Sequence, residues 1–210
     1  MQSFKNIYGK CVVEAMIKTI QDNADYLSEI DGAIGDGDHG VNMRKGFNLC
    51  AKELNGKELC FTDSLNVLGR VLMMEIGGSV GPLYGQFFRS MAKAGKGQEY
   101  ITREIFLQML NDALSGIQKI GGAKVGDKTL VDALVPAIKA YEEENDFFTA
   151  LKSMVVAAEK GKDSTKDLIA KLGRSSRLGE RSRGYLDAGA TSCFLLLKSM
   201  SNEITKLLSH

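Results

Sequence analysis

The chain has 210 residues, long enough for one domain that buries about 70% of its surface. Its 27 basic and 26 acidic residues leave a net charge of +1, which argues against a nucleic-acid-binding protein and against a polybasic membrane protein. A hydrophobic content of 44% excludes wholesale disorder, while 23 glycines and only 2 prolines favour uninterrupted helices joined by glycine-rich loops.

Apolar residues recur at helical spacing along most of the chain. In chain order, this pattern predicts helices over 12–20, 43–54, 65–76, 82–94, 102–120, 128–144, 147–160, 163–172 and 188–208. Thr102 is the expected N-cap of its helix, and Pro136 is expected to kink the helix that contains it. No segment alternates apolar and polar residues as a strand would. We therefore predict a single all-α domain over residues 1–210, with about eight helices in an antiparallel bundle.

The remaining composition indicates where the protein resides. No N-terminal basic segment precedes an apolar one, and no apolar run reaches the length of about 18 residues that crosses a membrane. We therefore expect a cytoplasmic protein that contacts no membrane. The four cysteines have no CxxC spacing and are predicted to be buried free thiols: Cys11, Cys50, Cys60 and Cys193.

Glycines are concentrated in four connectors between the predicted helices. These connectors lie at 32–40, 77–85, 121–126 and 173–189, and they hold 15 of the 23 glycines. Helix C-caps and turns account for about half of them. Glycine also lets the backbone approach a ligand, and helix N-termini present free amides to anions. We therefore look for function in these four connectors.

The first connector is acidic. Asp31, Asp36 and Asp38 lie within eight residues, with no Lys or Arg between residues 19 and 43. Repulsion among three carboxylates in one loop favours a divalent cation. The Glu that an EF-hand requires at its twelfth position is missing, and too few His and Cys residues are present for zinc, so Mg²⁺ fits best. A solvated acidic turn is the structural alternative. His39, beside this loop, is either a phosphate ligand and general acid or base, or a structural histidine.

The other three connectors suggest an anion site. Ser79 lies in the GGSVGPLYG segment, where loop amides and its hydroxyl suit a phosphate, although a tight turn explains the segment equally well. The GGAKVGDKT segment resembles a P-loop but has one extra residue and no preceding strand, so we expect Asp127 or Thr129 to cap a helix there. The fourth connector holds four arginines and has a net positive charge, which suits phosphate, a solvated loop or an acidic partner. Acidic and basic loops on one bundle suggest a Mg²⁺-nucleotide site.

Four segments together resemble the nucleotide-binding L subunits of bacterial dihydroxyacetone kinase, a family also found as the C-terminal domain of single-chain kinases. These segments are DGAIGDGDHGVNM, GGSVGPLYGQFF, GDKTLVDALVPA and LGERSRGYLDAGATS, and they occur in the order of the family. The similarity extends from Tyr8 to Leu208. It implies a barrel-like bundle of eight helices with a nucleotide site at one end.

The resemblance also implies roles for individual residues. Two Mg²⁺ ions would bind to Asp31, Asp36 and Asp38, and His39 and Arg174 would be catalytic. ADP or ATP would be bound by His39, Gly40, Val41, Asn42, Ser79, Val80, Gly121, Leu130, Arg174, Asp187, Ala188 and Gly189. The sequence departs from the family at Val80, where a hydroxyl is common, at Leu130, where methionine is frequent, and at Ala188, where proline is frequent.

In this family the sugar is bound covalently to a histidine of a separate K subunit. This chain has only His39 and His210, so the resemblance implies an enzyme that acts only with partners. Its ADP would be recharged by a phosphohistidine-bearing M subunit of the phosphotransferase system, or exchanged for ATP. The resemblance leaves open whether this chain forms a homodimer. The alternatives are a Mg-nucleotide-binding regulatory module and a subunit of a related kinase for another small ketose.

Overall fold

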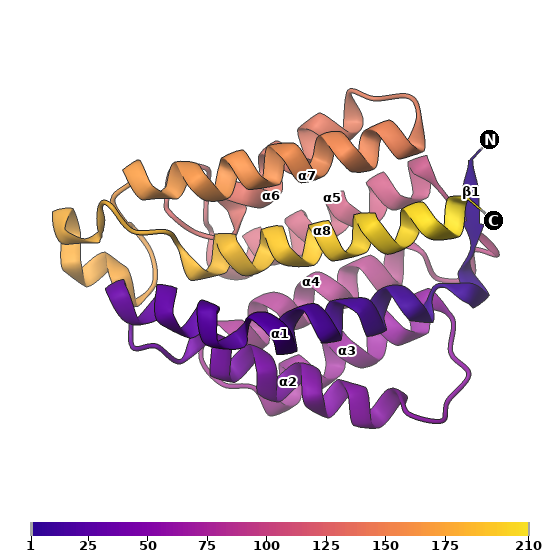
Figure 1. Cartoon of the computed structure of the whole chain (residues 1–210), viewed down its shortest axis with the longest axis horizontal. Coiled ribbons are helices and arrows are strands. Elements are labelled where there is room, and N and C mark those ends of the chain that lie inside the picture. Colours follow the sequence, from indigo (N-terminus) through magenta and orange to yellow (C-terminus); the bar gives the residue numbers. More distant parts are fainter. Residues whose placement is uncertain (1, 210) are drawn as a thin grey trace.

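The computed structural model describes residues 2–209 (Figure 1). These residues form eight α-helices, three 3₁₀ helices and one pair of short strands. The α-helices are α1 (Lys10–Ile34), α2 (His39–Leu54), α3 (Phe61–Glu75), α4 (Val80–Ala94), α5 (Arg103–Gly121), α6 (Val131–Glu142), α7 (Phe147–Ser164) and α8 (Ala188–Leu208). The strands are β1 (Ser3–Lys5) and β2 (Tyr100–Thr102), and the 3₁₀ helices are η1 (Asn6–Tyr8), η2 (Thr165–Asp167) and η3 (Arg174–Ser182). The all-α prediction is confirmed.

The helices close into a ring. Each α-helix packs against the next one along the chain, and α8 returns to pack against α1. Neighbouring helices run antiparallel, as Figure 1 shows, and every connector except the long one between α7 and α8 is short. The even-numbered helices α2, α4, α6 and α8 consequently all begin at the same end of the bundle. The chain termini and the β1–β2 pair lie at the opposite end.

The interior of the ring is filled by the apolar residues that recur at helical spacing. Aromatic rings pack around Phe88 with Phe47 and Phe87, between Phe106 and Tyr141, and between Phe4 and Phe61. Side chains cap several of the helices, including α5, α7 and α8. The hydroxyl of Thr102 accepts from the amide of Ile105 at 3.3 Å, as predicted, and helix α6 continues through Pro136. The kink expected there stays a prediction.

Several sequence predictions were wrong. Helix α1 continues to Ile34, so Asp31 lies in its last turn rather than in a loop. The helix predicted over 163–172 is absent, because the chain leaves helical geometry after η2 and the amide of Ala170 bonds to the Ser182 hydroxyl. The pairing of β1 with β2 was not predicted, since three residues are too few to show alternation.

Two smaller outcomes complete the comparison with the sequence. All four cysteines are free, as predicted, but only Cys50 and Cys193 are buried, whereas Cys11 and Cys60 are half-buried. Within residues 2–209, no helix is long and apolar enough to cross a membrane.

Helix α2 crosses α1 at a point of close backbone contact. Gly40, in the first turn of α2, is buried, and a Cβ atom there would overlap the carbonyl oxygen of Ala24. Gly32 on α1 is different, because it is exposed and a Cβ there would meet only the Cα of Gly37, at 3.9 Å. The absence of a side chain at Gly40 therefore sets how closely the start of α2 approaches α1.

We predict opposite effects for alanine at these two positions. Gly40→Ala should lower the free energy of unfolding by about 1–3 kcal/mol through overpacking, whereas Gly32→Ala should raise it by about 0.5–1 kcal/mol by restricting the unfolded chain. Urea unfolding of both variants and the wild type measures this. Equal stability of Gly40→Ala and wild type would contradict the packing argument.

Candidate functional site

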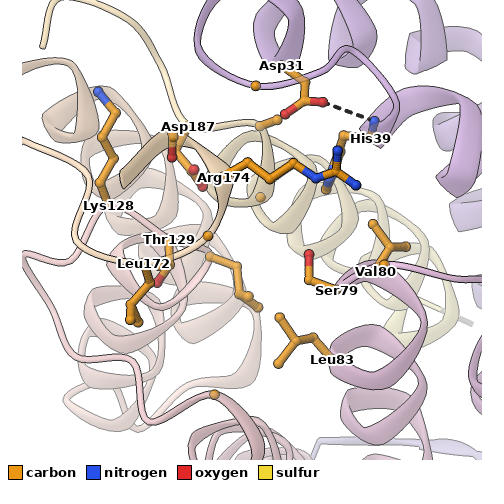
Figure 2. A pocket seen from close by; sticks show the side chains of 18 of the residues that line it. Asp31, His39, Ser79, Val80, Leu83, Lys128, Thr129, Leu172, Arg174 and Asp187 are labelled. Atoms are coloured by element: carbon orange, nitrogen blue, oxygen red, sulfur yellow. Dashed lines mark hydrogen bonds between the residues drawn. The ribbon is translucent and has the colours of Figure 1, made fainter. Parts of the chain in front are cut away.

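A cavity of about 340 Å³ lies at the end of the bundle where the even-numbered helices begin (Figure 2). Most of the residues predicted for the site line it. They are Asp31, Asp36, Asp38, His39, Asn42, Ser79, Val80, Gly121, Leu130, Arg174, Asp187, Ala188 and Gly189. Residues from all four glycine-rich connectors are thus brought to one place.

Two predicted ligand residues do not line the cavity. Gly40 is buried against α1, and the side chain of Val41 is 52% exposed on the outer face of the bundle. Residues within the first turn of a helix point in different directions, so only His39 and Asn42 of this segment reach the cavity. A packing role explains Gly40 without a ligand.

Helix N-termini give the cavity a positive potential. Helices α2, α4, α6 and α8 begin at His39, Val80, Val131 and Ala188, which lie in the wall of the cavity or adjoin it. The first amides of a helix lack partners within it, and the aligned peptide dipoles add partial positive charge there. Phosphate groups bind at such positions. Convergence of four N-termini makes this end of the bundle suited to a polyanion.

Three carboxylates face these N-termini. Asp31, Asp36 and Asp38 form the acidic cluster, in which one oxygen of each side chain lies within 4.8 Å of the others. The guanidinium of Arg174 pairs with Asp36 and lies 4.0 Å from Asp38. Burial, followed by the charges of Asp36 and Asp31, raises the pKa of Asp38. One guanidinium does not neutralise three acids, and the oxygen donors fit a hard divalent cation.

His39 is tied to a chain of hydroxyl groups. Its Nε2 atom lies 2.9 Å from the hydroxyl of Ser192, which lies 2.6 Å from the hydroxyl of Tyr84. The amide of His39 donates to the Asp31 carboxylate at 3.3 Å, the contact dashed in Figure 2. Burial lowers the pKa of His39 to about 4. The ring is therefore neutral at pH 7 and acts through hydrogen bonds rather than as a cation.

The Ser79–Val80 pair occupies the start of α4. Ser79 is the N-cap residue, but its hydroxyl makes no capping hydrogen bond, and in Figure 2 it points toward the middle of the cavity. Val80 is 5% exposed and packs into the core. The hydroxyl that the family has at position 80 is thus available here one residue earlier.

One wall of the cavity is apolar. Leu83, Ile117, Ala123, Leu130 and Leu172 line it, and Figure 2 shows Leu83 and Leu172 on the side away from Asp31 and His39. The cavity therefore has a charged part and an apolar part. This division suits a ligand that has anionic groups at one end and a flat, weakly polar group at the other.

Sequence reasoning missed several residues around the cavity. Tyr84 and Ser192 were not predicted as site residues, and nothing local to them signals a contact with His39. Lys128 is among the residues that line the cavity, but it is 1% exposed, and its Nζ atom donates to backbone carbonyls of its own chain. Burial lowers the pKa of Lys128. This orientation rules out the phosphate contact of a P-loop lysine. Its left-handed backbone, with φ of 62°, was invisible to periodicity.

The start of α6 is capped by Thr129, one of the two expected residues, and the connector before it is also bound by an acid that was not expected. Thr129 does accept from the amide of Val131 at 3.2 Å, as one of the two expected alternatives has it. The carboxylate of Asp127 instead accepts from Lys124. Asp132, from the first turn of α6, reaches back to the amides of Gly126 and Thr129. An acid inside the helix therefore organises this connector.

Asp187 supplies a testable electrostatic feature. It caps α8 by accepting from the amide of Ala190 at 2.7 Å. Burial raises its pKa to about 7, against the opposing effect of that hydrogen bond. Since an unfolded Asp has a pKa of about 3.9, the native state binds more protons between about pH 4 and pH 7. The contribution of this group to stability is therefore lost as the pH rises through that interval.

We predict that Asp187→Asn removes this dependence, because the amide keeps the cap but does not titrate. In chelator and without nucleotide, the stability of the variant relative to wild type should rise between pH 4.5 and pH 6.5, by up to about 1.4 kcal/mol per pH unit. Urea unfolding at three pH values measures it. Asp146→Asn is the matched control, since Asp146 caps α7 with a lowered pKa. Parallel curves for Asp187→Asn and wild type would contradict the assignment.

Comparison with known protein families shows that residues 33–202 match the family model of the DAK2 domain. The ADP-binding subunit DhaL of a PEP-dependent dihydroxyacetone kinase from Listeria innocua is 41% identical, over 86% of this chain and 88% of its own. The corresponding subunit of Escherichia coli is 35% identical, over 85% of this chain and 87% of its own. A D-erythrulose kinase of Mycolicibacterium smegmatis is 30% identical over 91% of this chain.

Solved structures show the same fold. The dihydroxyacetone kinase of C. freundii in its native form is similar with a TM-score of 0.72 and 26% identity. The match covers 97% of this chain but 35% of that kinase, so this chain spans about a third of its length. A second structure of that kinase, in complex with AMP-PNP and Mg²⁺, matches with a TM-score of 0.71 and 24% identity.

Proposed function

The chain belongs to the DAK2 domain family, and on this premise we propose that it is the nucleotide-binding subunit of a dihydroxyacetone kinase. In this role it holds Mg-ADP or Mg-ATP and transfers the γ-phosphoryl group to dihydroxyacetone on a partner subunit. Relatives at 34–41% identity are ADP-binding subunits of dihydroxyacetone kinases. The proposal rests above all on one observation, the convergence of four helix N-termini and the acidic cluster on a single cavity.

The division of the cavity orients the nucleotide. Phosphates lie best at the charged part, where the starts of α2, α4 and α8 and the hydroxyl of Ser79 offer hydrogen-bond donors. The adenine base fits the apolar part, against Leu83, Leu130 and Leu172. Gly121 lies in the same part of the wall. Leu130 is of similar volume to the methionine frequent in the family, so the exchange is mild.

The acidic cluster suits two Mg²⁺ ions. Asp31, Asp36 and Asp38 offer oxygen ligands within 4.8 Å of one another, and without a cation they would repel the phosphates. When bound, Mg²⁺ offsets the charge of the phosphates and polarises the transferred group. The pairing of Arg174 with Asp36 indicates that the cluster attracts the nearest available cation.

Arg174 and His39 are the candidates for catalytic residues. With metal on the carboxylates, the guanidinium of Arg174 is free to contact the transferred phosphoryl, whose charge it stabilises. His39 is held neutral, so it donates or accepts a hydrogen bond at the phosphates. In the transfer, the bond from the γ-phosphorus to ADP breaks while the sugar hydroxyl oxygen forms a new bond to phosphorus. The proton of the hydroxyl passes to a base outside this cavity.

The sugar belongs on a partner. Apart from His39 the sequence has only His210, and among residues 2–209 no second histidine adjoins the cavity to bind a ketose covalently. We propose a K subunit that carries the sugar and an M subunit whose phosphohistidine recharges bound ADP. PEP-dependent and PTS-dependent relatives support the second partner. Because the partner selects the sugar, a related kinase for another small ketose stays the alternative, and the D-erythrulose kinase relative favours it.

We predict that nucleotide binding requires Mg²⁺. ADP with Mg²⁺, at about 100 times its Kd, should stabilise the native state by about 2.7 kcal/mol and raise the Tm by about 5 °C or more. ADP with chelator should give much less. Asp36→Asn should erase most of the difference, whereas Glu29→Gln, an exposed acid of α1 outside the cavity, should keep it. Equal shifts with chelator and with Mg²⁺ would rule out the metal.

We also predict that this chain phosphorylates no sugar by itself. Transfer requires the phosphoryl group and the hydroxyl to meet at about 3 Å in a site closed to water, and a partner supplies that second wall. With the K subunit present, one turnover per bound ATP is expected, and continued turnover should need the phosphohistidine donor.

The measurement is dihydroxyacetone phosphate formed with each partner omitted in turn, after the bound nucleotide has been identified by denaturation and chromatography. Sustained product from this chain and ATP alone contradicts the partner requirement. Steady turnover with only the K subunit and free ATP indicates exchange of ATP instead of recharging. Tight binding of Mg-ADP without transfer to any added K subunit would favour the regulatory module.

A further inference from the structure

Arg174 is carried by a long segment that has no α-helix. We call residues 168–185 the Arg174 loop. It leaves η2 and returns almost to its own start, where the amide of Gly184 donates to the carbonyl of Lys166 at 2.7 Å. The next turn is tied to the same place, since the amide of Asp187 donates to the Thr165 hydroxyl at 3.0 Å. The loop therefore has a narrow neck, formed by residues 165–168 and 182–187, and an extended body between these two segments.

Lys128 lies inside that neck. Its Nζ atom donates to three backbone carbonyls, those of Leu168 at 3.2 Å, Ser182 at 2.6 Å and Tyr185 at 2.7 Å. An ammonium group has three donors, and all three are used. The acceptors come from both segments of the neck, with Leu168 in the first and Ser182 and Tyr185 in the second. One side chain from the start of α6 thus joins the outgoing and the returning chain.

This arrangement is specific. Lys128 is 1% exposed, and among the described residues no carboxylate pairs with it within 4 Å. Burial of an unpaired ammonium is unfavourable unless hydrogen bonds replace its water shell. Removal of the ammonium would in turn leave three converging carbonyl oxygens without a donor. The residue also adopts a left-handed backbone, with φ of 62°, which few side chains tolerate. Both features indicate that a lysine is required at this position because its ammonium group binds these three carbonyl groups.

The Arg174 loop, fastened at its neck in this way, places Arg174 beside the acidic cluster. Between the ends of the neck, the chain passes Gly173 in a left-handed conformation and enters η3 at Arg174. In Figure 2 the side chain of Arg174 extends toward His39, while the end of the Lys128 side chain points in another direction. Lys128 lines the cavity, but carbonyls of the neck use its three ammonium donors, so its influence on the phosphate site is transmitted through the loop.

We propose that Lys128 is a positioning residue, an internal cation that fastens the neck of the Arg174 loop so that Arg174 faces the phosphoryl group. The inference deepens the proposed function and rests on it. It assigns a role to Lys128, the lysine of the GDKT segment. The segment resembles a P-loop in sequence, but its lysine has a different role from the phosphate-binding lysine of a P-loop. The ammonium binds carbonyls of its own chain, and the guanidinium that it positions faces the anion.

The test compares Lys128→Met with a control on the same loop. Lys171→Met is the matched variant, because Lys171 is 62% exposed and pairs with Asp127 at the surface. Hydrogen exchange of the nucleotide-free chain, followed by mass spectrometry, reports the order of residues 168–185. Titration with Mg–AMP-PNP then measures the affinity of wild type, both variants, Arg174→Met and the double variant of Lys128 and Arg174.

We expect faster exchange across the Arg174 loop in Lys128→Met only, with the other segments unchanged. Its affinity for Mg–AMP-PNP should fall about tenfold, the scale of one lost charge-assisted hydrogen bond. In the Arg174→Met background the same change should have little further effect, because the two residues act through one contact. A lysine with a merely structural role would not give this coupling.

Three results would overturn the proposal. They are unchanged exchange in Lys128→Met, an equal effect of Lys171→Met, and independent, additive losses of affinity for Lys128 and Arg174. If Lys128→Met does not fold, Lys128→Gln, which retains two donors, replaces it, and unfolding of both variants would show that the lysine serves the fold and not the loop. A wild-type chain that binds no Mg–AMP-PNP refutes the proposed function instead, while the exchange experiment still tests the neck.

Discussion

Four helices that begin at one end of the bundle are the constraint on which the rest of the structure depends. Neighbouring helices run antiparallel, so α2, α4, α6 and α8 start together. Their unpartnered amides and dipoles make that end positive. The connectors between an odd and the following even helix meet there too, and this is why the glycine-rich segments at 32–40, 77–85, 121–126 and 173–189 form one cavity.

The charges around this cavity balance one another. The acidic cluster would repel a nucleotide, and the helix N-termini attract it, so a bound cation is needed for both to act together. Arg174 pairs with Asp36 and brings a positive charge to the acidic cluster. Its position depends on an irregular loop that α-helices cannot supply, and the polar contacts inside the neck of that loop take the place of a helix's hydrogen-bond ladder.

Periodicity predicted the elements well where packing follows the helix repeat. The helix expected over 102–120 and its Thr102 cap are present, because an apolar stripe and a capping hydroxyl are local features. It failed at 163–172, where Leu168 and Leu172 have helical spacing but the backbone groups of Leu168 and Ala170 bond to Lys128 and Ser182. Those partners lie 40 and 12 residues away, so no window along the chain contains the competing interaction.

The sequence by itself determined the all-α class and the segments from which a site could be built, because helix spacing, glycine content and local charge are properties of short stretches. Which members of those segments face the cavity was decided only by tertiary structure. Gly40 packs on α1 and Val41 faces outward, while His39 between Asp38 and Gly40 meets Ser192, which is 153 residues away. Burial of Lys128 and the lowered pKa of His39 likewise depend on loss of water, and only the packing of all eight helices removes it.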